Sequence, residues 1–315
     1  RGIDPAGKEQ ERVRGGRRAT KTWNAMRMGG SVCKGKPARP ATLRPADAWI
    51  LSRFGDAVRG FEAAADKYRF DQAMAITEDF LWHEFADNYV ELVKHRAYSE
   101  DDQGAKYALY TVGLGLLKMM SVFLPHAAED AYQLTFRQFE PAVSIHVSDW
   151  PEAPSADPQA DEKGETVKGV VSAVRAWKAA KGLSLNAEIS RVEIVGQDAV
   201  RLTSGSEEDI KATLKAGKVE LMESVATQES VSRIKPVHAK LGPAYKKLAK
   251  EIAQRLEALS GPDASLSEKG LALVLSDGTE LTLSPEFYQV EKRISSERGE
   301  LDQIRVGTLS VLVYQ

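Results

Sequence analysis

The sequence predicts two structural parts, an all-α helical bundle followed by an α+β unit. The chain has 315 residues, which is more than one bundle needs and enough for two domains with separate cores. Hydrophobic residues recur at helical spacing as far as about Phe139, whereas helix and strand patterns alternate after Thr166. Between them, the segment from Trp150 to Glu165 contains three prolines and little to bury. We therefore expect a bundle over residues 1–149, a linker over 150–165 and an α+β domain over 166–315.

The bundle pattern divides into four long helices and one short helix. Gly29-Gly30 ends the first helix, and Pro45 suits the first turn of the second. A third run extends through residues 73–93, and Ser99-Glu100-Asp101-Asp102 begins the fourth with acids at its positive end. Pro125 precedes the short helix. Trp49 and Trp150 are expected to be packing residues.

The second half predicts an α+β unit that ends in a strand. Helices are expected over 166–181 and 207–216, and another through residues 245–259. Asp277-Gly278 between two alternating runs predicts a β-hairpin with a two-residue turn. The remaining strands are expected at 189–195, 218–222, 231–236, 288–294 and 309–314.

Charge is distributed unevenly along the chain. The net charge is only −2, but residues 1–50 hold twelve Lys or Arg against four Asp or Glu. Residues 51–165 hold ten against twenty-one, and residues 166–315 hold twenty-one against twenty. A basic segment beside an acidic one attracts a polyanion at one place and repels it elsewhere. The simpler interpretation, a solvated basic helix face, is favoured on charge alone.

Candidate RNA contacts lie on the first predicted helix, within Arg17-Arg18-Ala19-Thr20-Lys21-Thr22-Trp23-Asn24-Ala25-Met26-Arg27. Arg17, Arg18, Lys21 and Arg27 carry charges that neutralise phosphates, and Asn24 can hydrogen-bond to a base edge. Trp23 can stack on an unpaired base. Helical spacing alone makes a core position for Trp23 the more common outcome, so both roles stay open.

Groups that carry catalysis are sparse. The five histidines are scattered without metal-binding spacing, and we predict no metal site and no catalytic residues. Cys33 is the single cysteine, which excludes an internal disulfide; its nearby cations alone do not make a catalytic thiol. Gly113-x-Gly115 lies within a helical pattern and predicts close packing. No apolar run reaches the roughly 20 residues that cross a bilayer, so a soluble, cytoplasmic protein is expected.

Three motifs resemble the region after the catalytic core of valyl-tRNA synthetases. They are the Lys-x-Trp-Asn helix at Lys21, the Asp-x-Trp-Ile-Leu-Ser start at Asp47, and the Ser-Ile-His-x-Ser-x-Trp-Pro exit at Ser144. They occur in the family's order and cover the chain from Gly2 to about Pro151. Short motifs near Lys235-Pro236 and Leu241-Gly242-Pro243 resemble the C-terminal module of archaeal-type valyl and isoleucyl enzymes.

This resemblance implies an anticodon-binding helical bundle whose partners are valine tRNAs and the catalytic core of a parent synthetase. Residue by residue it implies tRNA contacts for Lys21, Asn24 and Arg27, while Met28 stands where the family usually carries an aromatic. The sequence contains neither a His-Ile-Gly-His nor a Lys-Met-Ser-Lys-Ser motif. The resemblance therefore implies a part that binds no cofactor and is inactive alone, although its parent would use ATP to join valine to tRNA.

Two alternatives remain open at this point. The first is the same region of isoleucyl-tRNA synthetase, which shares this architecture. The second is a protein-interaction module that docks a partner through acidic residues of the third helical run, namely Glu78, Asp79, Glu84, Asp87 and Glu91.

Overall fold

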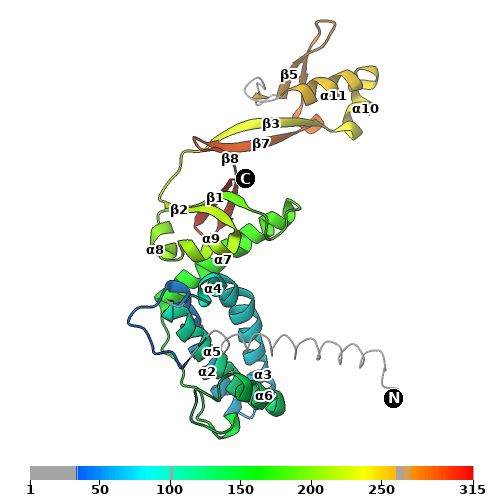
Figure 1. Cartoon of the computed structure of the whole chain (residues 1–315). Coiled ribbons are helices and arrows are strands. Elements are labelled where there is room, and N and C mark those ends of the chain that lie inside the picture. Colours follow the sequence, from blue (N-terminus) through cyan, green and yellow to red (C-terminus); the bar gives the residue numbers. More distant parts are fainter. Residues whose placement is uncertain (1–32, 34, 100–101, 260–265, 268–269, 315) are drawn as a thin grey trace, which may run out of the picture. The chain divides into compact units, whose positions relative to one another are not determined.

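The computed structural model describes residues 33, 35–99, 102–259, 266–267 and 270–314. These residues form two compact units. The first unit runs to Glu188 and also includes Asp198–Leu221, and the second combines Ile189–Gln197 with the chain from Met222 onward. The first unit is mainly helical and the second contains most of the strands (Figure 1).

The first unit begins with a set of antiparallel helices. Its elements are α2 (Pro45–Ala65), α3 (Phe70–Asp79), η1 (Phe80–Tyr89), α4 (Val90–Ala97), α5 (Gln103–Ser121), α6 (Pro125–Thr135) and the short η2 (Ile145–Val147). It continues with α7 (Pro158–Ala180), α8 (Ala199–Thr203), α9 (Glu207–Leu214) and β2 (Ala216–Met222). The predicted bundle helices within the described residues are confirmed; the first predicted helix lies outside them.

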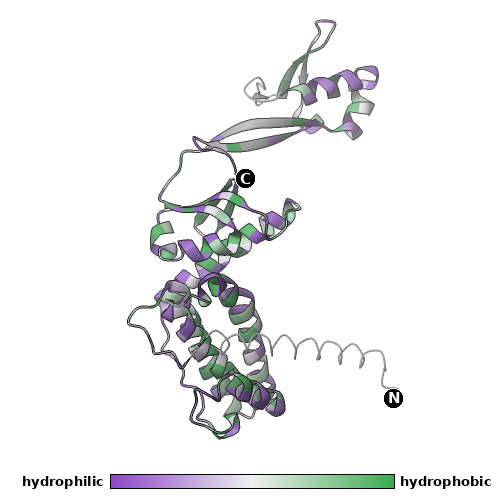
Figure 2. Cartoon of the chain, in the orientation of Figure 1, coloured by the Kyte–Doolittle hydropathy of each residue, from purple (hydrophilic) through white to green (hydrophobic). Residues whose placement is uncertain are grey.

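Periodicity explains how α2 takes the centre of this unit. Pro45 occupies the first turn, where its missing N–H costs no hydrogen bond. Trp49, Phe54, Val58 and Phe61 follow at helical spacing, and all four are buried. In Figure 2 the helices of this unit carry hydrophobic residues on one side and hydrophilic residues on the other. Their apolar sides pack together and form the core.

The continuous helical run from Phe70 to Ala97 contains an unexpected π-helical stretch, η1. Three of its aromatic side chains, Phe80, Phe85 and Tyr89, are buried, and the rings of Phe85 and Tyr89 stack with centroids 6.0 Å apart. A π-helical turn rotates the residues that follow it relative to an ideal α-helix. It therefore sets which face of α4 meets the bundle.

The segment predicted as a linker is different from our expectation. Helix α7 begins at Pro158, and Asp157 caps it by accepting hydrogen bonds from the backbone of Gln159 and Ala160. Gly164 lies so close to the Trp49 ring of α2 that a Cβ there would collide with it. The indole Nε1 of Trp49 also donates to Glu165 at 3.3 Å. Residues 158–165 therefore pack on the bundle, because a helix with a glycine contact face buries well without large side chains.

The tryptophan that precedes this helix also packs. Trp150 is partly exposed, and its ring lies 4.9 Å from the Phe61 ring of α2, centroid to centroid. Trp49 is completely buried. The packing roles predicted for both tryptophans are confirmed.

A buried lysine closes the end of α7. The side chain of Lys178 is fully buried, and its Nζ donates to the carbonyl oxygens of Leu185, Ala187 and Leu214 at 2.6–3.1 Å. Three donors matched by three acceptors satisfy the ammonium group. Burial lowers the pKa of Lys178. The lysine ties the chain after α7 to the C-terminal end of α9.

The second unit contains an antiparallel sheet with strands in the order β1-β9-β8-β7-β3. Their bounds are β1 (Ile189–Val195), β3 (Gln228–Pro236), β7 (Tyr288–Ser296), β8 (Gly299–Val306) and β9 (Leu309–Tyr314). Strand β8 was not predicted, because its side chains alternate only weakly in hydrophobicity. Glu193 of β1 is buried and accepts hydrogen bonds from Arg298 at 2.6 Å and from the Tyr314 hydroxyl at 2.9 Å.

A smaller three-stranded sheet, two α-helices and two short 3-10 turns complete the described part of the second unit. They are β4 (Leu266–Ser267), β5 (Gly270–Val274), β6 (Glu280–Leu283), η5 (Pro285–Phe287), α10 (His238–Tyr245), η3 (Lys246–Leu248) and α11 (Ala249–Ala258). The predicted hairpin is confirmed, since β5 pairs with β6. Its turn is longer than the two residues expected: the Leu275 N–H donates to the Thr279 carbonyl oxygen, so the loop is Ser276-Asp277-Gly278, with a φ of +83° at Gly278. Leu241, Ile252 and Leu256 pack against Leu271 and Leu283. The expected combination of a helical part and an α+β part is thus present.

Candidate functional site

The side chains predicted to contact RNA lie outside the described residues. They are Arg17, Arg18, Lys21, Trp23, Asn24 and Arg27, together with the neighbouring Met28. Their roles therefore remain predictions. The described part of the first unit shows the helices that follow them in the chain and the recess that residues 40–44 help to form.

Arg96 is the centre of a buried charge cluster at one end of the bundle. Its guanidinium donates to Asp47 of α2 at 2.9 and 3.1 Å and to Asp209 of α9 at 2.9 and 3.1 Å. It also donates to both oxygens of Asp102, the N-cap of α5, at 3.0 and 3.1 Å. We name Arg96, Asp47, Asp102 and Asp209 the Arg96 cluster. The planar guanidinium suits this role because its five N–H groups point in fixed directions.

The cluster is almost completely withdrawn from solvent. The Arg96 side chain is 5% exposed, Asp47 is 0% and Asp209 is 1%. Burial opposes the charge on Arg96, but pairing with Asp47 and Asp209 outweighs it and raises the arginine pKa. Burial raises the pKa of the Tyr89 hydroxyl, which donates to Asp47 at 2.8 Å. Breaking one partner would leave an uncompensated charge in the core.

The cluster joins four elements that are distant in the sequence. Asp47 lies 49 residues and Asp209 lies 113 residues from Arg96. Because Asp209 belongs to α9, the ion pairs fix the short helices after α7 to the bundle. In the sequence, Lys94-His95-Arg96 indicates only the basic last turn of a helix, where cations favour the negative helix end. No local spacing identifies partners so far away.

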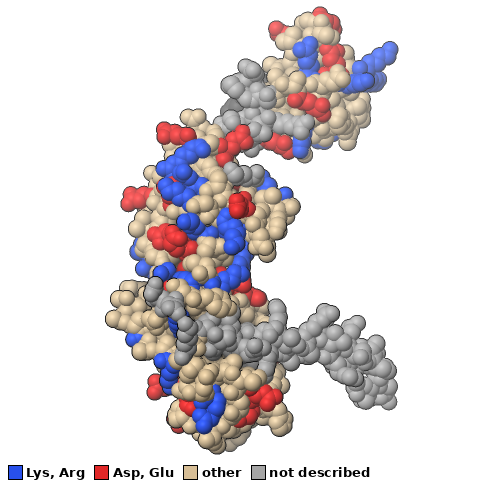
Figure 3. All heavy atoms as spheres, viewed as in Figure 1, with Lys and Arg blue, Asp and Glu red and all other residues tan. Residues whose placement is uncertain are grey.

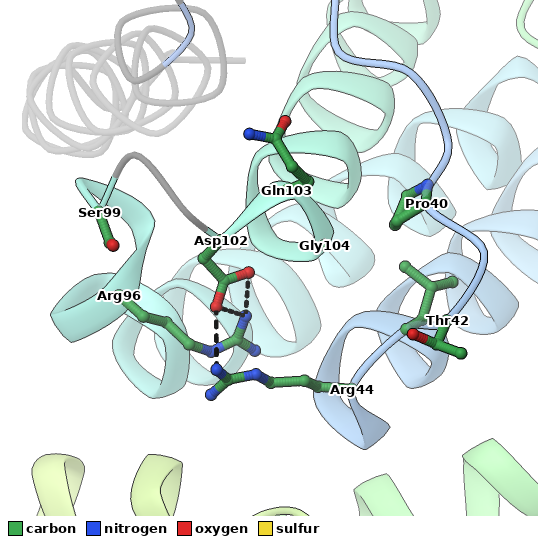
Figure 4. Close-up of a pocket in the computed structure, with 9 residues that line it drawn as sticks. Pro40, Thr42, Arg44, Arg96, Ser99, Asp102, Gln103 and Gly104 are labelled. Carbon is green, nitrogen blue, oxygen red and sulfur yellow. Dashed lines mark hydrogen bonds and ion pairs between the residues drawn. The ribbon is translucent and has the colours of Figure 1, made fainter.

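A recess of about 380 Å³ opens beside the Arg96 cluster. Its lining includes Pro40, Thr42, Arg44, Ser99, Gln103 and Gly104. Figure 4 shows Arg44 and Arg96 converging on Asp102, with Ser99 and Gln103 at the rim. Arg44 lies 3.5 Å from Asp102, and its side chain is 50% exposed. Arg44 is therefore the cation of this recess that an approaching ligand can reach.

The charged groups of the recess and of the Arg96 cluster nearly balance one another. Three carboxylates, Asp47, Asp102 and Asp209, face two guanidinium groups, so the charge of the recess and cluster together is about one negative unit. Such a balance does not hold a buried phosphate. Ser99 and Gln103 lie at the rim, and among the described residues that line the recess no nucleophile stands beside a general base.

Cys33 is unsuited to catalysis. Its side chain is buried, and its Sγ lies 3.8 Å from the carbonyl oxygen of Lys106. Burial raises the thiol pKa to about 11, an effect that Lys106 offsets only in part. The thiolate needed for nucleophilic attack is therefore scarce at neutral pH.

The acidic residues of the third helical run are partly used within the chain. Glu84 is 13% exposed and accepts from Lys168 of α7 at 3.2 Å. Glu91 pairs with Lys94 at 2.7 Å and lies 3.8 Å from Arg175 of α7. Helix α7 thus neutralises part of the surface that an interaction module would present. This arrangement does not favour the protein-docking alternative.

Two further features are absent from the described residues. No group of three or more histidine, cysteine or acidic side chains there is arranged to hold a metal ion. Within the same residues, no helix has the length and hydrophobicity needed to span a membrane.

Comparison with known proteins identifies the helical part. Residues 47–194 match the family described as the anticodon-binding domain of tRNA ligase. The valine–tRNA ligase of Pyrococcus furiosus is 31% identical over 279 residues, which are 86% of this chain and 31% of that protein. That of Thermococcus kodakarensis is 33% identical over 282 residues, or 87% of this chain and 32% of that protein.

A third relative gives the same result. The valine–tRNA ligase of Methanosarcina barkeri is 32% identical over 308 residues, which are 93% of this chain and 34% of that protein. The chain therefore spans about a third of the length of these curated relatives. The resemblance inferred from the motifs at Lys21, Asp47 and Ser144 is confirmed. Residues 47–194 thus match an anticodon-binding domain of the tRNA-ligase type, and most of the chain is similar to about a third of the length of archaeal valine–tRNA ligases.

Proposed function

We propose that this chain binds valine tRNA and reads its anticodon through the first unit. The observation that carries the proposal is the anticodon-binding match over residues 47–194, within a chain 31–33% identical to archaeal valine–tRNA ligases. These relatives favour the valyl assignment over the isoleucyl alternative. The uneven charge supports RNA binding, because the basic residues gather ahead of an acidic bundle.

The predicted contacts divide into two kinds. Lys21, Arg17 and Arg18 hold phosphates, which position the RNA without reading its sequence. Asn24 and Arg27 meet base edges in the unpaired anticodon loop, where a side chain can reach them. Trp23 either stacks on a base or anchors its helix in the core.

The Arg96 cluster supports this function by holding the bundle rigid. It fixes α2, α4 and the start of α5 to one another through charged hydrogen bonds. RNA contacts on a rigid surface lose less conformational freedom on binding. Arg44, on the chain that leads from the basic segment into α2, supplies one further exposed cation.

We further propose that the 315 residues bind tRNA without catalysing its aminoacylation. The sequence holds neither synthetase signature motif, and the described surface offers no phosphate-cradling loop. ATP and valine would bind a catalytic core that accompanies this region in the whole protein. The chain alone should then show no valine-dependent exchange of pyrophosphate into ATP.

A salt titration of tRNA binding tests the proposal. The full chain is mixed with a labelled valine tRNA transcript, and binding is followed by fluorescence anisotropy from about 50 to 200 mM salt. We expect affinity to fall steeply as salt rises, because released counterions drive phosphate binding. Absence of binding at low salt, or an affinity unaffected by salt, would refute the proposal.

A further inference from the structure

A concentrated cationic surface lies in the second unit, away from the residues assigned above. Residues 235–250 include five lysines and no acidic residue. Two of these lysines are neutralised: Lys235 pairs with Glu291 at 2.5 Å and Lys240 with Glu286 at 3.4 Å. The other three are Lys246, Lys247 and Lys250, which we name the lysine surface. All three are exposed, and no ion pair within the described residues involves them.

Helical spacing makes Lys247 and Lys250 neighbours, and Lys246 directly precedes them in the chain. Lys246 and Lys247 lie in η3, and Lys250 follows in the first turn of α11. Residues three and four positions apart are neighbours on a helical surface. The opposite side of α11 is buried through Ile252, Ala253 and Leu256. In Figure 3, Lys and Arg side chains (blue) project from the part of the second unit that carries α10 and α11 in Figure 1.

Fold stability does not account for three lysines at this position. Like charges at this spacing repel one another, and the start of a helix disfavours cations. The nearest acid in the chain, Glu251, is directed elsewhere and accepts a hydrogen bond from the Ser276 backbone at 2.6 Å. Lys246 also has a φ of +44° and a ψ of −108°, a conformation that side chains with a Cβ rarely adopt.

The surroundings indicate contact with phosphates and not with bases. Base recognition in single strands uses exposed aromatic rings. The described aromatic residues of the second unit are buried or packed: Tyr245 meets the Phe287 ring edge-on at 5.3 Å, and Tyr288 and Tyr314 are buried. Lysine ammonium groups act as compact point charges that suit phosphate oxygens. This combination favours sequence-independent binding of a sugar–phosphate backbone.

We propose that Lys246, Lys247 and Lys250 hold the sugar–phosphate backbone of the tRNA at a second place, independent of its anticodon. This inference rests on the proposed function, since tRNA is its ligand. The first unit then supplies sequence discrimination and the lysine surface supplies affinity. An acidic membrane is the competing partner of similar charge.

A triple substitution with a matched control tests the proposal on the full chain. The test variant is Lys246→Ala/Lys247→Ala/Lys250→Ala. The control is Lys218→Ala/Lys235→Ala/Lys240→Ala, which removes the same charge from three exposed lysines that are paired with glutamates. Circular dichroism and thermal melting establish that both variants fold.

At about 0.1 M salt we expect the test variant to bind valine tRNA roughly tenfold more weakly than the unaltered chain. Its plot of log affinity against log salt should be shallower by about 2–3, because each lost phosphate contact removes a slope of about 0.7–0.9. The control should change affinity by less than about threefold, since its lysines are already paired. A valine tRNA with an altered anticodon should lose affinity for the test variant by the same factor.

Several outcomes would overturn the inference. If the unaltered chain binds tRNA and the test variant binds equally well, the lysine surface is not a contact and the proposed function stands. If the unaltered chain does not bind tRNA, both proposals fail. If the test variant loses affinity only for the tRNA with the valine anticodon, the three lysines contact anticodon bases and not the backbone. Binding to phosphatidylserine vesicles that only the test variant loses, with tRNA affinity unchanged, would assign the surface to membranes.

A single substitution separates binding from a structural role. Lys246→Gly removes one charge and also relieves the unusual backbone conformation. We expect a higher melting temperature together with weaker tRNA binding of a few fold. A lower melting temperature with unchanged tRNA affinity would assign Lys246 to the fold and contradict the proposal.

Discussion

Arg96 of α4 donates two hydrogen bonds, of 2.9 and 3.1 Å, to Asp47 of α2. Both side chains are almost completely buried. A buried ion pair stabilises the fold little more than apolar side chains of the same size would. Removing one partner is costly, however, because the other charge stays buried without a partner. The same guanidinium also serves Asp102 and Asp209. One arginine thus holds together the end of the bundle beside which Arg44 is exposed.

Removing this arginine should destabilise the first unit severely. We expect Arg96→Ala to lower the free energy of unfolding by about 3–5 kcal/mol, because three carboxylates lose their partner. Arg201→Ala is the control, since it breaks an exposed pair with Glu162 and should cost less than about 1 kcal/mol. Urea denaturation measures both values. Equal losses would show that the Arg96 cluster does not stabilise the fold.

The contact between Gly164 and Trp49 gives a second prediction. Gly164→Ala places a Cβ inside the Trp49 ring, so we expect a loss of about 1–3 kcal/mol in unfolding free energy. Gly242→Ala in α10 meets nothing within 4 Å and should be neutral or slightly stabilising. Thermal melting of both variants decides. An unaffected Gly164→Ala would mean that α7 does not pack on α2.

Limited proteolysis checks the same region independently. Trypsin should spare Lys163 and Lys168 in the native chain, because both lie within α7 and helical backbone must unfold to enter a protease. Both sites should become sensitive in urea. Rapid native cleavage after Lys163, identified by mass spectrometry, would restore the linker that we first expected.

Cys33 should react slowly in the folded protein. Burial raises its thiol pKa from 9.0 to about 11, so at pH 8 almost no thiolate is present to react with iodoacetamide. A folded pKa above the unfolded value adds stability below pH 9, and this contribution is lost as pH rises toward 11. The Cys33→Ala variant should not show this loss of stability between pH 9 and 11. If iodoacetamide labels Cys33 as fast in the native protein as in urea, the thiol is not buried as described.

The predicted RNA contacts are separable by substitution. Lys21→Ala should weaken all tRNAs about equally and make the salt dependence shallower, as expected of a phosphate contact. Asn24→Ala or Arg27→Ala should instead reduce the preference for valine tRNA by roughly 1–3 kcal/mol for each lost base contact. Binding assays with valine tRNA and one unrelated tRNA distinguish these results. Unchanged affinity and preference in all three folded variants would remove the first predicted helix as the reader.

Trp23 needs its own test because two roles were left open. If Trp23 is a core residue, Trp23→Ala should cost about 3–5 kcal/mol of stability. If Trp23 stacks on a base, stability should survive and tRNA affinity should fall by about 1–3 kcal/mol. Melting and binding measured on the same sample separate the two. No change in either quantity would exclude both roles.

Much of the helical architecture follows from local sequence. Trp49, Phe54, Val58 and Phe61 recur at helical spacing, and the structure buries all four on α2. The Asp277-Gly278 turn identified its hairpin because glycine admits a positive φ there. These signals act within a few residues, where backbone geometry alone decides the structure.

The remaining features depend on long-range packing. Asp157-Pro158 is a good helix start, but the surrounding prolines and acids suggested a linker, and only the contact of Gly164 with Trp49 reveals α7 as part of the bundle. The partners of Arg96 were inaccessible to sequence reasoning because an ion pair across 113 residues leaves no periodic pattern. The RNA-binding site was predicted from motifs on the first predicted helix, and that helix lies outside the described residues.

The most direct test of the central claim is the affinity of the full chain for one tRNA before and after its anticodon is exchanged. Valine tRNA and a variant that differs only at its anticodon are titrated at the same salt concentration. We predict that the exchange weakens binding about tenfold or more, since one lost base contact corresponds to roughly 1–3 kcal/mol. Equal affinity for the two tRNAs would contradict anticodon reading by this chain.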